Sequence, residues 1–160
     1  MAIITLNNNS LSSVTALPAG VGGKIIQYAA DYDTSFISLT TTSMVDTGLS
    51  ISFTPISSSS TIFIQGCVQH YASGAQSSHG SMNVKVVKDG SDLTETYSSY
   101  AGYGGTEALF NGMLPFYHSE TSGNTTARTY KVQVANNSNT AGASYNQYGG
   151  HSALIILEIA

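Results

Sequence analysis

The chain has 160 residues and a formal net charge of −4, and only 9% of its residues are charged, compared with about 25% in an average soluble protein. Its basic residues are spread along the chain, so no basic stripe can neutralise a run of phosphates and we expect no nucleic-acid partner. The single cysteine, Cys67, excludes an intrachain disulfide and a cysteine-based zinc cage. Its apolar neighbours predict that it is a small buried side chain.

The length corresponds to about one domain, with enough residues to enclose a core between two packed sheets. No apolar run approaches the roughly 20 residues that cross a membrane, so we expect no membrane partner. The first residues lack a charged region and reach Asn7 after a short apolar stretch, which does not fit a secretory signal. Since charge is scarce, hydroxyl, amide and glycine groups must form the surface, and we expect much of it to be contact surface.

Residues 1–22 differ in composition from the rest and predict an extended N-terminal arm that ends in a Pro/Gly hinge. Ile3, Ile4 and Leu6 form a short apolar strip at its start. Such a strip is either a strand of the chain's own sheet or a segment that docks on a neighbouring protein, and the sequence leaves both open. For the docking alternative, these three residues are the expected particle-docking contacts, by addition of a strand to an exposed sheet edge.

Residues 23–160 predict one all-β domain, an antiparallel β-sandwich of jelly-roll-like type. Runs of β-branched and aromatic residues are bounded by Gly, Ser, Asn, Asp or Pro, and no segment has a helical period. The expected strands are residues 23–30, 35–43, 49–54, 61–71, 82–88, 93–97, 108–117, 127–135 and 151–159.

Two of these strands alternate strictly between apolar and polar residues, which predicts one face on a core and one on water or a partner. In the first, Leu49, Ile51 and Phe53 share a face; in the second, residues 130, 132 and 134 oppose residues 131, 133 and 135. Pro55 predicts that the first ends there or lies at an edge. Asp89 and Gly90 favour a type I′ turn, so residues 82–88 and 93–97 should pair as a hairpin.

Two longer loops are predicted at residues 73–81 and 98–106. Tyr97, Tyr100 and Tyr103 stand among small residues at the second, a composition found in binding surfaces where tyrosine supplies contact area at low entropic cost. These tyrosines are either an outward binding loop, able to stack on a sugar, or a cover for one end of the sandwich.

No constellation for catalysis is visible, so we expect that the chain is not an enzyme and holds no cofactor. Acidic residues come close together only at Asp31 with Asp33 and at Asp89 with Asp92, and the spacing of a calcium loop is absent. His70, His79, His118 and His151 lack the spacing of a zinc protease, and an ion on a symmetry axis of identical chains stays only a minor alternative.

Several segments resemble a family of small β-sandwich virion proteins of tailed bacteriophages. They are LNNNSLSSV (6–14), LPAG (17–20), MVDTGLSISFTP (44–55), TIFI (61–64), TYKVQ (129–133) and LIILEIA (154–160). The resemblance spans almost the whole chain, except residues 73–103, and its motifs are strand and turn sequences.

The resemblance implies a capsid decoration or cement protein, often trimeric, or a fibre-tip module. Because the chain has no room for a fibre shaft, a decoration protein that binds the major capsid protein or another virion protein is the first expectation. A tail- or head-fibre tip that binds a host receptor or glycan is the alternative. Either role implies a homotrimer located in the virion after synthesis in the host cytoplasm.

Overall fold

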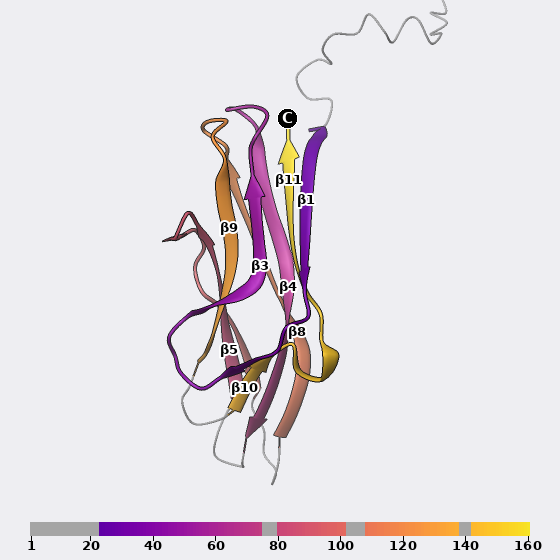
Figure 1. Cartoon of the computed structure of the whole chain (residues 1–160), viewed down its shortest axis with the longest axis vertical. Coiled ribbons are helices and arrows are strands. Elements are labelled where there is room, and N and C mark those ends of the chain that lie inside the picture. Colours follow the sequence, from indigo (N-terminus) through magenta and orange to yellow (C-terminus); the bar gives the residue numbers. More distant parts are fainter. Residues whose placement is uncertain (1–22, 75–79, 102–107, 138–141) are drawn as a thin grey trace, which may run out of the picture.

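The computed structural model describes residues 23–74, 80–101, 108–137 and 142–160. Over these ranges the chain forms antiparallel strands and one short 3-10 turn, η1 (Gln147–Gly149) (Figure 1). The strands are β1 (Ile25–Asp33), β2 (Ile37–Leu39), β3 (Val45–Phe53), β4 (Thr61–Gly74), β5 (Gly80–Lys88), β6 (Ser91–Asp92), β7 (Tyr97–Ala101), β8 (Ala108–Thr121), β9 (Arg128–Asn136), β10 (Gly142–Tyr145) and β11 (Ser152–Ile159).

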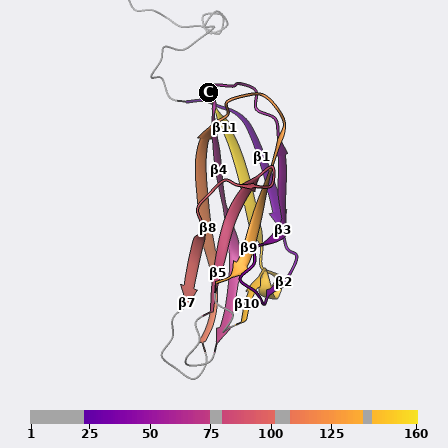
Figure 2. The same cartoon turned by 90° about the vertical axis from the view of Figure 1, so that its left-hand side faces the viewer.

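The strands form two sheets that pack face to face. Sheet A has the order β1-β11-β4, and β8 pairs with the other side of β4. Because β4 has 14 residues, it pairs with β11 along its first half and with β10 along its second half, and β2 continues from β10. Sheet B has the order β3-β9-β5, and the far side of β5 pairs with β6 and then β7. Figure 2 brings sheet B to the front.

The four-stranded orders β1-β11-β4-β8 and β3-β9-β5-β7 are those of a jelly roll, in which each sheet takes strands from distant parts of the chain. The predicted fold class, an all-β antiparallel sandwich of jelly-roll-like type, is therefore confirmed. The arm and hinge predicted for residues 1–22 lie outside the described residues, so the predicted boundary between arm and domain stays a prediction.

Alternating side chains from both sheets fill the space between them. Leu49, Ile51 and Phe53 of β3 are buried, while the serines between them are exposed, as the alternation predicts. The same side of sheet B carries residues 130, 132 and 134 of β9, and Ile64 of β4 and Ile156 of β11 face them from sheet A. Ala135 departs from the predicted pattern, since it is buried rather than exposed.

The Asp-Gly turn has the predicted form. Asp89 has φ of 50° and Gly90 has φ of 81°, the two positive values that a type I′ turn requires. The hairpin itself is shorter than predicted, because the regular ladder with β5 ends at Asp92, and the Leu93 and Thr94 N–H groups then both donate to the Val86 carbonyl oxygen, at 3.0 and 3.3 Å. The strand predicted at residues 93–97 is wrong: the Thr94 hydroxyl accepts a hydrogen bond from the Val86 N–H at 3.0 Å, and strand pairing resumes at β7.

Other boundaries also differ from the predictions. The strand predicted over residues 35–43 is only Ile37–Leu39, and the prediction missed the strand β10. Pro55 does follow an edge strand, since β3 ends at Phe53 at the margin of sheet B. Cys67, predicted to be buried, is half-buried, because its side chain lies on the outer face of sheet A.

Candidate interaction surface

The first acidic pair, Asp31 and Asp33, lies on β1 rather than in a turn, and it joins the two sheets along one edge of the sandwich. Asp31 Oδ2 accepts a hydrogen bond from the Ser50 N–H at 2.8 Å, and Asp33 Oδ2 accepts one from the Gly48 N–H at 3.0 Å. These donors belong to β3, the edge strand of sheet B. The two carboxylates therefore occupy backbone groups that an edge strand would otherwise offer to another chain.

Asp33 is also held from within its own sheet. It accepts hydrogen bonds from the Ser35 hydroxyl at 2.7 Å and from the Tyr145 hydroxyl at 2.9 Å. Burial raises the pKa of the Asp33 carboxyl, but the hydrogen bonds from Ser35, Tyr145 and the Gly48 N–H outweigh burial and leave the pKa below its usual value. Asp33 is thus an ionised acceptor that organises strands.

The second acidic pair holds the hairpin turn. Asp89 Oδ1 accepts a hydrogen bond from the Thr129 N–H at 2.8 Å, and Asp92 forms a 2.7 Å ion pair with Lys85. The two carboxylates have separate partners on neighbouring strands, and each has a structural task in sheet B.

The described histidines lie on different elements. His70 is fully buried on β4, where burial lowers its pKa to about 4. His118 lies on β8, and His151 is exposed before β11. Across the described ranges, no group of three His, Cys, Asp or Glu side chains could hold a metal ion. His79 lies outside the described residues.

The outer face of sheet A is an extended surface without charged residues, and we call it the sheet A face. Its residues follow from the strand registers and the alternation of side chains. They are Tyr28, Ala30 and Tyr32 of β1; Ala153, Ile155, Leu157 and Ile159 of β11; Thr61, Phe63, Gln65, Cys67 and Gln69 of β4; and Met113, Pro115, Tyr117, Ser119 and Thr121 of β8.

The registers align these residues in rows across four strands. One row runs Tyr28, Leu157, Phe63 and Ser119. A second row runs Tyr32, Ala153, Cys67 and Pro115. None of the positions in the sheet A face is Asp, Glu, Lys, Arg or His.

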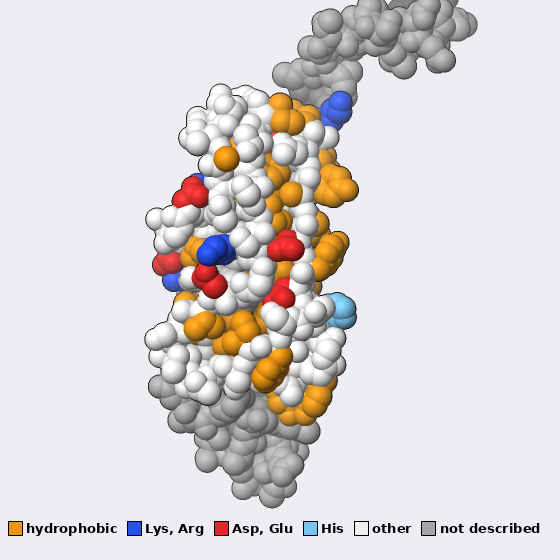
Figure 3. Space-filling model, viewed as in Figure 1, with side chains coloured by type: hydrophobic (Ala, Val, Ile, Leu, Met, Phe, Trp, Pro, Cys, Tyr) orange, Lys and Arg blue, Asp and Glu red, His pale blue; other side chains and the backbone are white. Residues whose placement is uncertain are grey.

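The charged side chains of the sandwich lie elsewhere. Sheet B carries the ion pairs Lys85–Asp92 and Lys131–Asp46, the second at 2.8 Å. In Figure 3, which views the sheet A face edge-on, hydrophobic side chains project one after another along the margin where β1 lies, and charged side chains gather over sheet B. The two outer faces of the molecule therefore differ strongly in charge.

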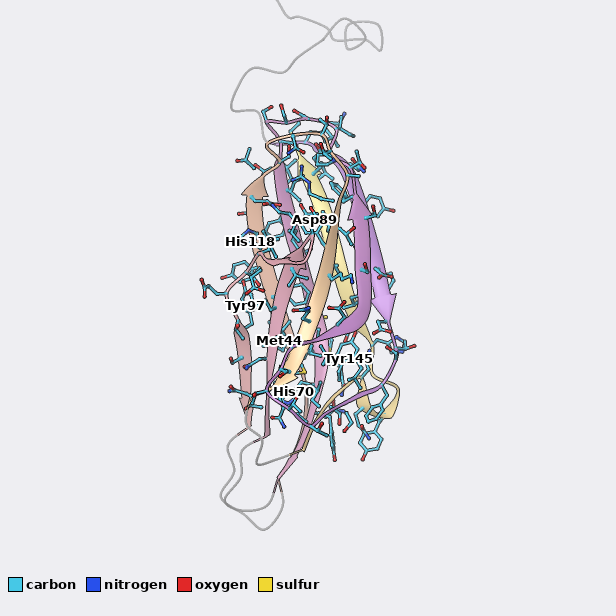
Figure 4. All side chains as sticks on the ribbon, turned by 60° about the vertical axis from the view of Figure 1, so that its left-hand side comes forward. Met44, His70, Asp89, Tyr97, His118 and Tyr145 are labelled. Atoms are coloured by element: carbon cyan, nitrogen blue, oxygen red, sulfur yellow. The ribbon has the colours of Figure 1, made fainter. Side chains whose placement is uncertain are left out.

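The tyrosines predicted for an outward loop have different positions from those expected. Tyr97 begins the strand β7, and Tyr100 pairs with Ser81 of β5 on the same strand, while Tyr103 lies outside the described residues. The Tyr97 hydroxyl donates to the Tyr117 carbonyl oxygen, and the two rings are 6.1 Å apart. Figure 4 places Tyr97 at mid-height of the sandwich, so the expectation of a loop at one end is wrong for this residue.

A cleft of about 440 Å³ lies beside Tyr97, at the edge of the sandwich that holds β7 and β8, whereas Asp31 and Asp33 lie at the opposite edge. It forms at residues 93–96, between β6 and β7, where the regular ladder with β5 is interrupted. Tyr97 and His118 line it together with Lys85, Asp92, Leu93, Thr94, Glu95 and Thr96. The cleft therefore combines an aromatic ring, hydroxyls and carboxylates, groups that bind polar ligands such as sugars.

One pattern in the sequence does point to the sheet A face. The run from Leu154 to Leu157 is apolar without alternation, a pattern of strands that are covered on both faces. Ile3, Ile4 and Leu6, the predicted docking residues, lie outside the described residues, so the structure describes no contact of theirs.

No family model matches the chain, and no curated protein matches it. Among solved structures, the chain is similar to the C-terminal domain of EclA, a sugar-binding protein, at 11% identity and a TM-score of 0.40, with 95% of this chain and 99% of that chain covered. It is also similar to a chain of the T13 particle of infectious bursal disease virus (IBDV), at 8% identity and a TM-score of 0.40, with coverage of 84% and 38%.

A second structure of infectious bursal disease virus, the Gx strain, has 15% identity and a TM-score of 0.39, with coverage of 84% and 40%. At these identities and TM-scores, none of the neighbours carries an inference about function. Among the described residues, no helix has the length and apolar character needed to span a membrane.

Proposed function

We propose that this chain is a structural component of a tailed-bacteriophage particle, a capsid decoration or cement protein that binds the capsid surface and self-associates as a trimer. The observation that carries the proposal is the sheet A face, an uncharged and largely apolar sheet surface on a jelly roll. Single exposed apolar residues are ordinary, but contiguous apolar patches mark sites of protein association.

The acidic residues support a structural role. Asp31 and Asp33 bind the backbone of β3, Asp46 and Asp92 pair with lysines, and Asp89 binds the backbone of β9. These five carboxylates are thus engaged in joining strands, a different role from general acid–base catalysis. The proposal includes that the chain has no catalytic activity of its own.

Attachment to the capsid is assigned to the arm. Ile3, Ile4 and Leu6 would add a strand to an exposed sheet edge of a capsid protein, with main-chain hydrogen bonds for affinity and side-chain pockets for specificity. One arm binds weakly because its ordering costs oppose apolar burial. Three arms on one trimer act together through effective concentration, which turns a weak contact into stable attachment.

The test measures attachment and copy number. Purified particles are analysed by quantitative mass spectrometry, and particles that lack the protein are incubated with the full chain or with a variant from which residues 2–16 are deleted. Hundreds of copies per particle, and loss of binding by a folded truncated chain, are the expected results. Binding of the truncated chain at wild-type occupancy would remove the arm from the proposal.

A fibre-tip module that binds a host glycan is the second candidate, and the cleft beside Tyr97 favours it. The exposed Tyr117 ring, close to Tyr97, is a surface on which a sugar ring could stack. A few tens of copies per particle, together with weaker adsorption to host cells after Tyr97→Ser/Tyr117→Ser substitution, would favour this candidate over decoration.

A further inference from the structure

We infer that the sheet A face is the surface through which copies of this chain associate with one another. This inference rests on the self-association in the proposed function and adds the surface that performs it. The inference is the same whether the chain is a capsid decoration protein or a fibre-tip module.

The face presents large apolar side chains to solvent in the single chain. Tyr28 is 73% exposed, Tyr32 is 71% exposed, Tyr117 is 66% exposed and Met113 is 51% exposed. These residues lie on the two outer strands β1 and β8, and the half-buried Leu157 and Phe63 lie between them. Apolar area therefore runs across the whole width of the sheet, and its removal from water is favourable.

The area of the face approaches what a protein interface needs. Four strands at about 4.8 Å spacing, with positions 61 to 67 of β4 at about 3.3 Å per residue, give a flat footprint of roughly 400 Å². Because its side chains protrude, the accessible area of the face is larger than this flat footprint. It comes closer to the roughly 800 Å² that each partner buries in a standard interface. Two or three such faces can therefore form a stable contact.

The chemistry of the face favours a second copy as its occupant. A face without charge meets an identical face without like-charge repulsion, whereas a partner with a charged surface would lose the hydration of its charges and receive no counter-charge. The polar groups that the face exposes are hydroxyls and the Gln65 amide, because Gln69 is buried and its amide is bonded to Asn111 and to the Gln147 N–H. Hydroxyls and amides are both donors and acceptors, so these groups can pair with the same groups of a copy. Three faces turned toward a common axis would each be covered by two neighbours.

The edges of the sandwich are consistent with association through a face. At the edge formed by β1 and β3, Asp31 and Asp33 occupy the backbone donors of β3. On β8, Pro115 has no N–H to donate, and the Tyr97 hydroxyl already donates to the Tyr117 carbonyl oxygen. Since both edges are partly occupied, contact through the apolar face is the stronger route to assembly.

The experiment compares lysine substitutions on the two edge strands. Tyr28→Lys/Tyr32→Lys places two charges on exposed positions of β1 in the sheet A face, and Tyr117→Lys places one on β8. The control, Ser50→Lys/Ser52→Lys, places two charges two positions apart on exposed positions of β3, on the outer face of sheet B. Circular dichroism checks that each full-length variant is folded, and sedimentation velocity at micromolar concentrations gives its mass.

We expect the wild type and the control to sediment as the same oligomer, and both sheet A variants to lose at least about tenfold in association constant, because like charges would face each other in the interface. A wild-type chain that sediments as a 16.7 kDa monomer overturns the inference. So does an oligomer that survives in folded sheet A variants or that dissociates in the control. A chain that is monomeric and associates only after deletion of residues 2–16 would instead show that its own arm covers the face.

The proposed function can fail without this inference. A chain that associates through the sheet A face but is absent from purified particles removes the virion role and leaves the interface intact.

Discussion

The Ser60 hydroxyl donates a 2.6 Å hydrogen bond to Glu158 Oε1, although 98 positions separate the two residues in the chain. Glu158 is fully buried on β11, and it also accepts hydrogen bonds from the Ile56 and Ser57 N–H groups, each at 2.9 Å. A buried carboxylate thus anchors the serine-rich turn between β3 and β4. Burial raises the pKa of Glu158, but the bonds from Ser60 and the two N–H groups outweigh it and lower the pKa.

We predict that Glu158→Gln destabilises the domain by about 3 kcal/mol, because the amide accepts fewer of these hydrogen bonds and the buried donors lose an ionised partner. Urea unfolding followed by circular dichroism measures the change. Glu95→Gln, at an exposed position, is the control and should change the free energy of unfolding by less than about 0.5 kcal/mol. A loss below about 1 kcal/mol for Glu158→Gln would contradict the assigned role.

We predict that the folded chain loses stability as the pH falls from neutral to about 4, because His70 is buried. Burial lowers its pKa to about 4 in the folded chain, whereas an unfolded histidine has its ordinary pKa of about 6.5, so the unfolded chain binds a proton in this interval and the folded chain does not. Stability is therefore complete above about pH 6.5 and falls as the pH drops toward 4, by about 3 kcal/mol for a shift of this size. His70→Gln should remove this part of the pH dependence in urea unfolding at pH 7.0, 5.5 and 4.5.

The same measurements separate the contribution of His70 to stability from that of Glu158. The folded-state pKa of Glu158 is lowered from 4.5, so its stabilising contribution is present above pH 4.5 and is lost as the pH falls through the folded value. The wild type should lose stability in both intervals, and His70→Gln only in the lower one. Equal slopes between pH 6.5 and 4.5 in both proteins would contradict the assignment to His70.

Replacing Asp31 and Asp33 together by alanine should open the seam between β1 and β3. Each substitution leaves an edge-strand N–H without its carboxylate, at an exposed site, for a cost of about 1 kcal/mol each. The freed edge of β3 should also raise the tendency to aggregate, measured by light scattering on mild heating. Asn in place of Asp keeps an acceptor oxygen and should restore most of the stability; equal losses for Ala and Asn would argue against these bonds.

Gly66→Ala should be among the most destabilising single-methyl changes in the chain. A Cβ atom at residue 66 would overlap the Ala153 carbonyl oxygen and the Phe116 ring, so β4, β11 and β8 would have to move apart locally. Overpacking of this kind costs about 1–3 kcal/mol. Ser52→Ala, at an exposed position on the outer face of sheet B, is the control in thermal unfolding. A melting temperature for Gly66→Ala equal to that of the control would show that the sheet accommodates the methyl group.

The core of sheet B could be predicted from the sequence because its strands, β3 above all, have one buried apolar face and one exposed polar face. Leu49, Ile51 and Phe53 alternate with serine, and this contrast alone indicates which side is buried. The turn at Asp89 and Gly90 could be predicted for a local reason too, since the φ values that it needs are those that Gly and Asp tolerate.

The parts that were missed depend on distant contacts. The regular ladder with β5 ends after Asp92, where the Leu93 and Thr94 N–H groups share the Val86 carbonyl oxygen. The Thr94 hydroxyl also accepts from the Val86 N–H, a side-chain contact that local propensity does not report. The strand β10 has few β-branched residues and forms because β4 extends past β11 and offers it a partner. The sheet A face was missed because the run from Leu154 to Leu157 indicates burial of both faces without indicating what covers the outer one.

The pairing of β1 with β11 determines when sheet A can form during synthesis of the chain. Ile25 pairs with Ile159, so the first described strand waits for nearly all of the sequence between them before it can pair. Closing so long a loop is entropically costly, and folds dominated by distant pairings form slowly. Since β11 lies between β1 and β4 and supplies the middle of the apolar face, a nascent chain acquires that face only after residues up to Ile159 have left the ribosome. If copies associate through the sheet A face as proposed, their assembly would wait until each copy is fully folded.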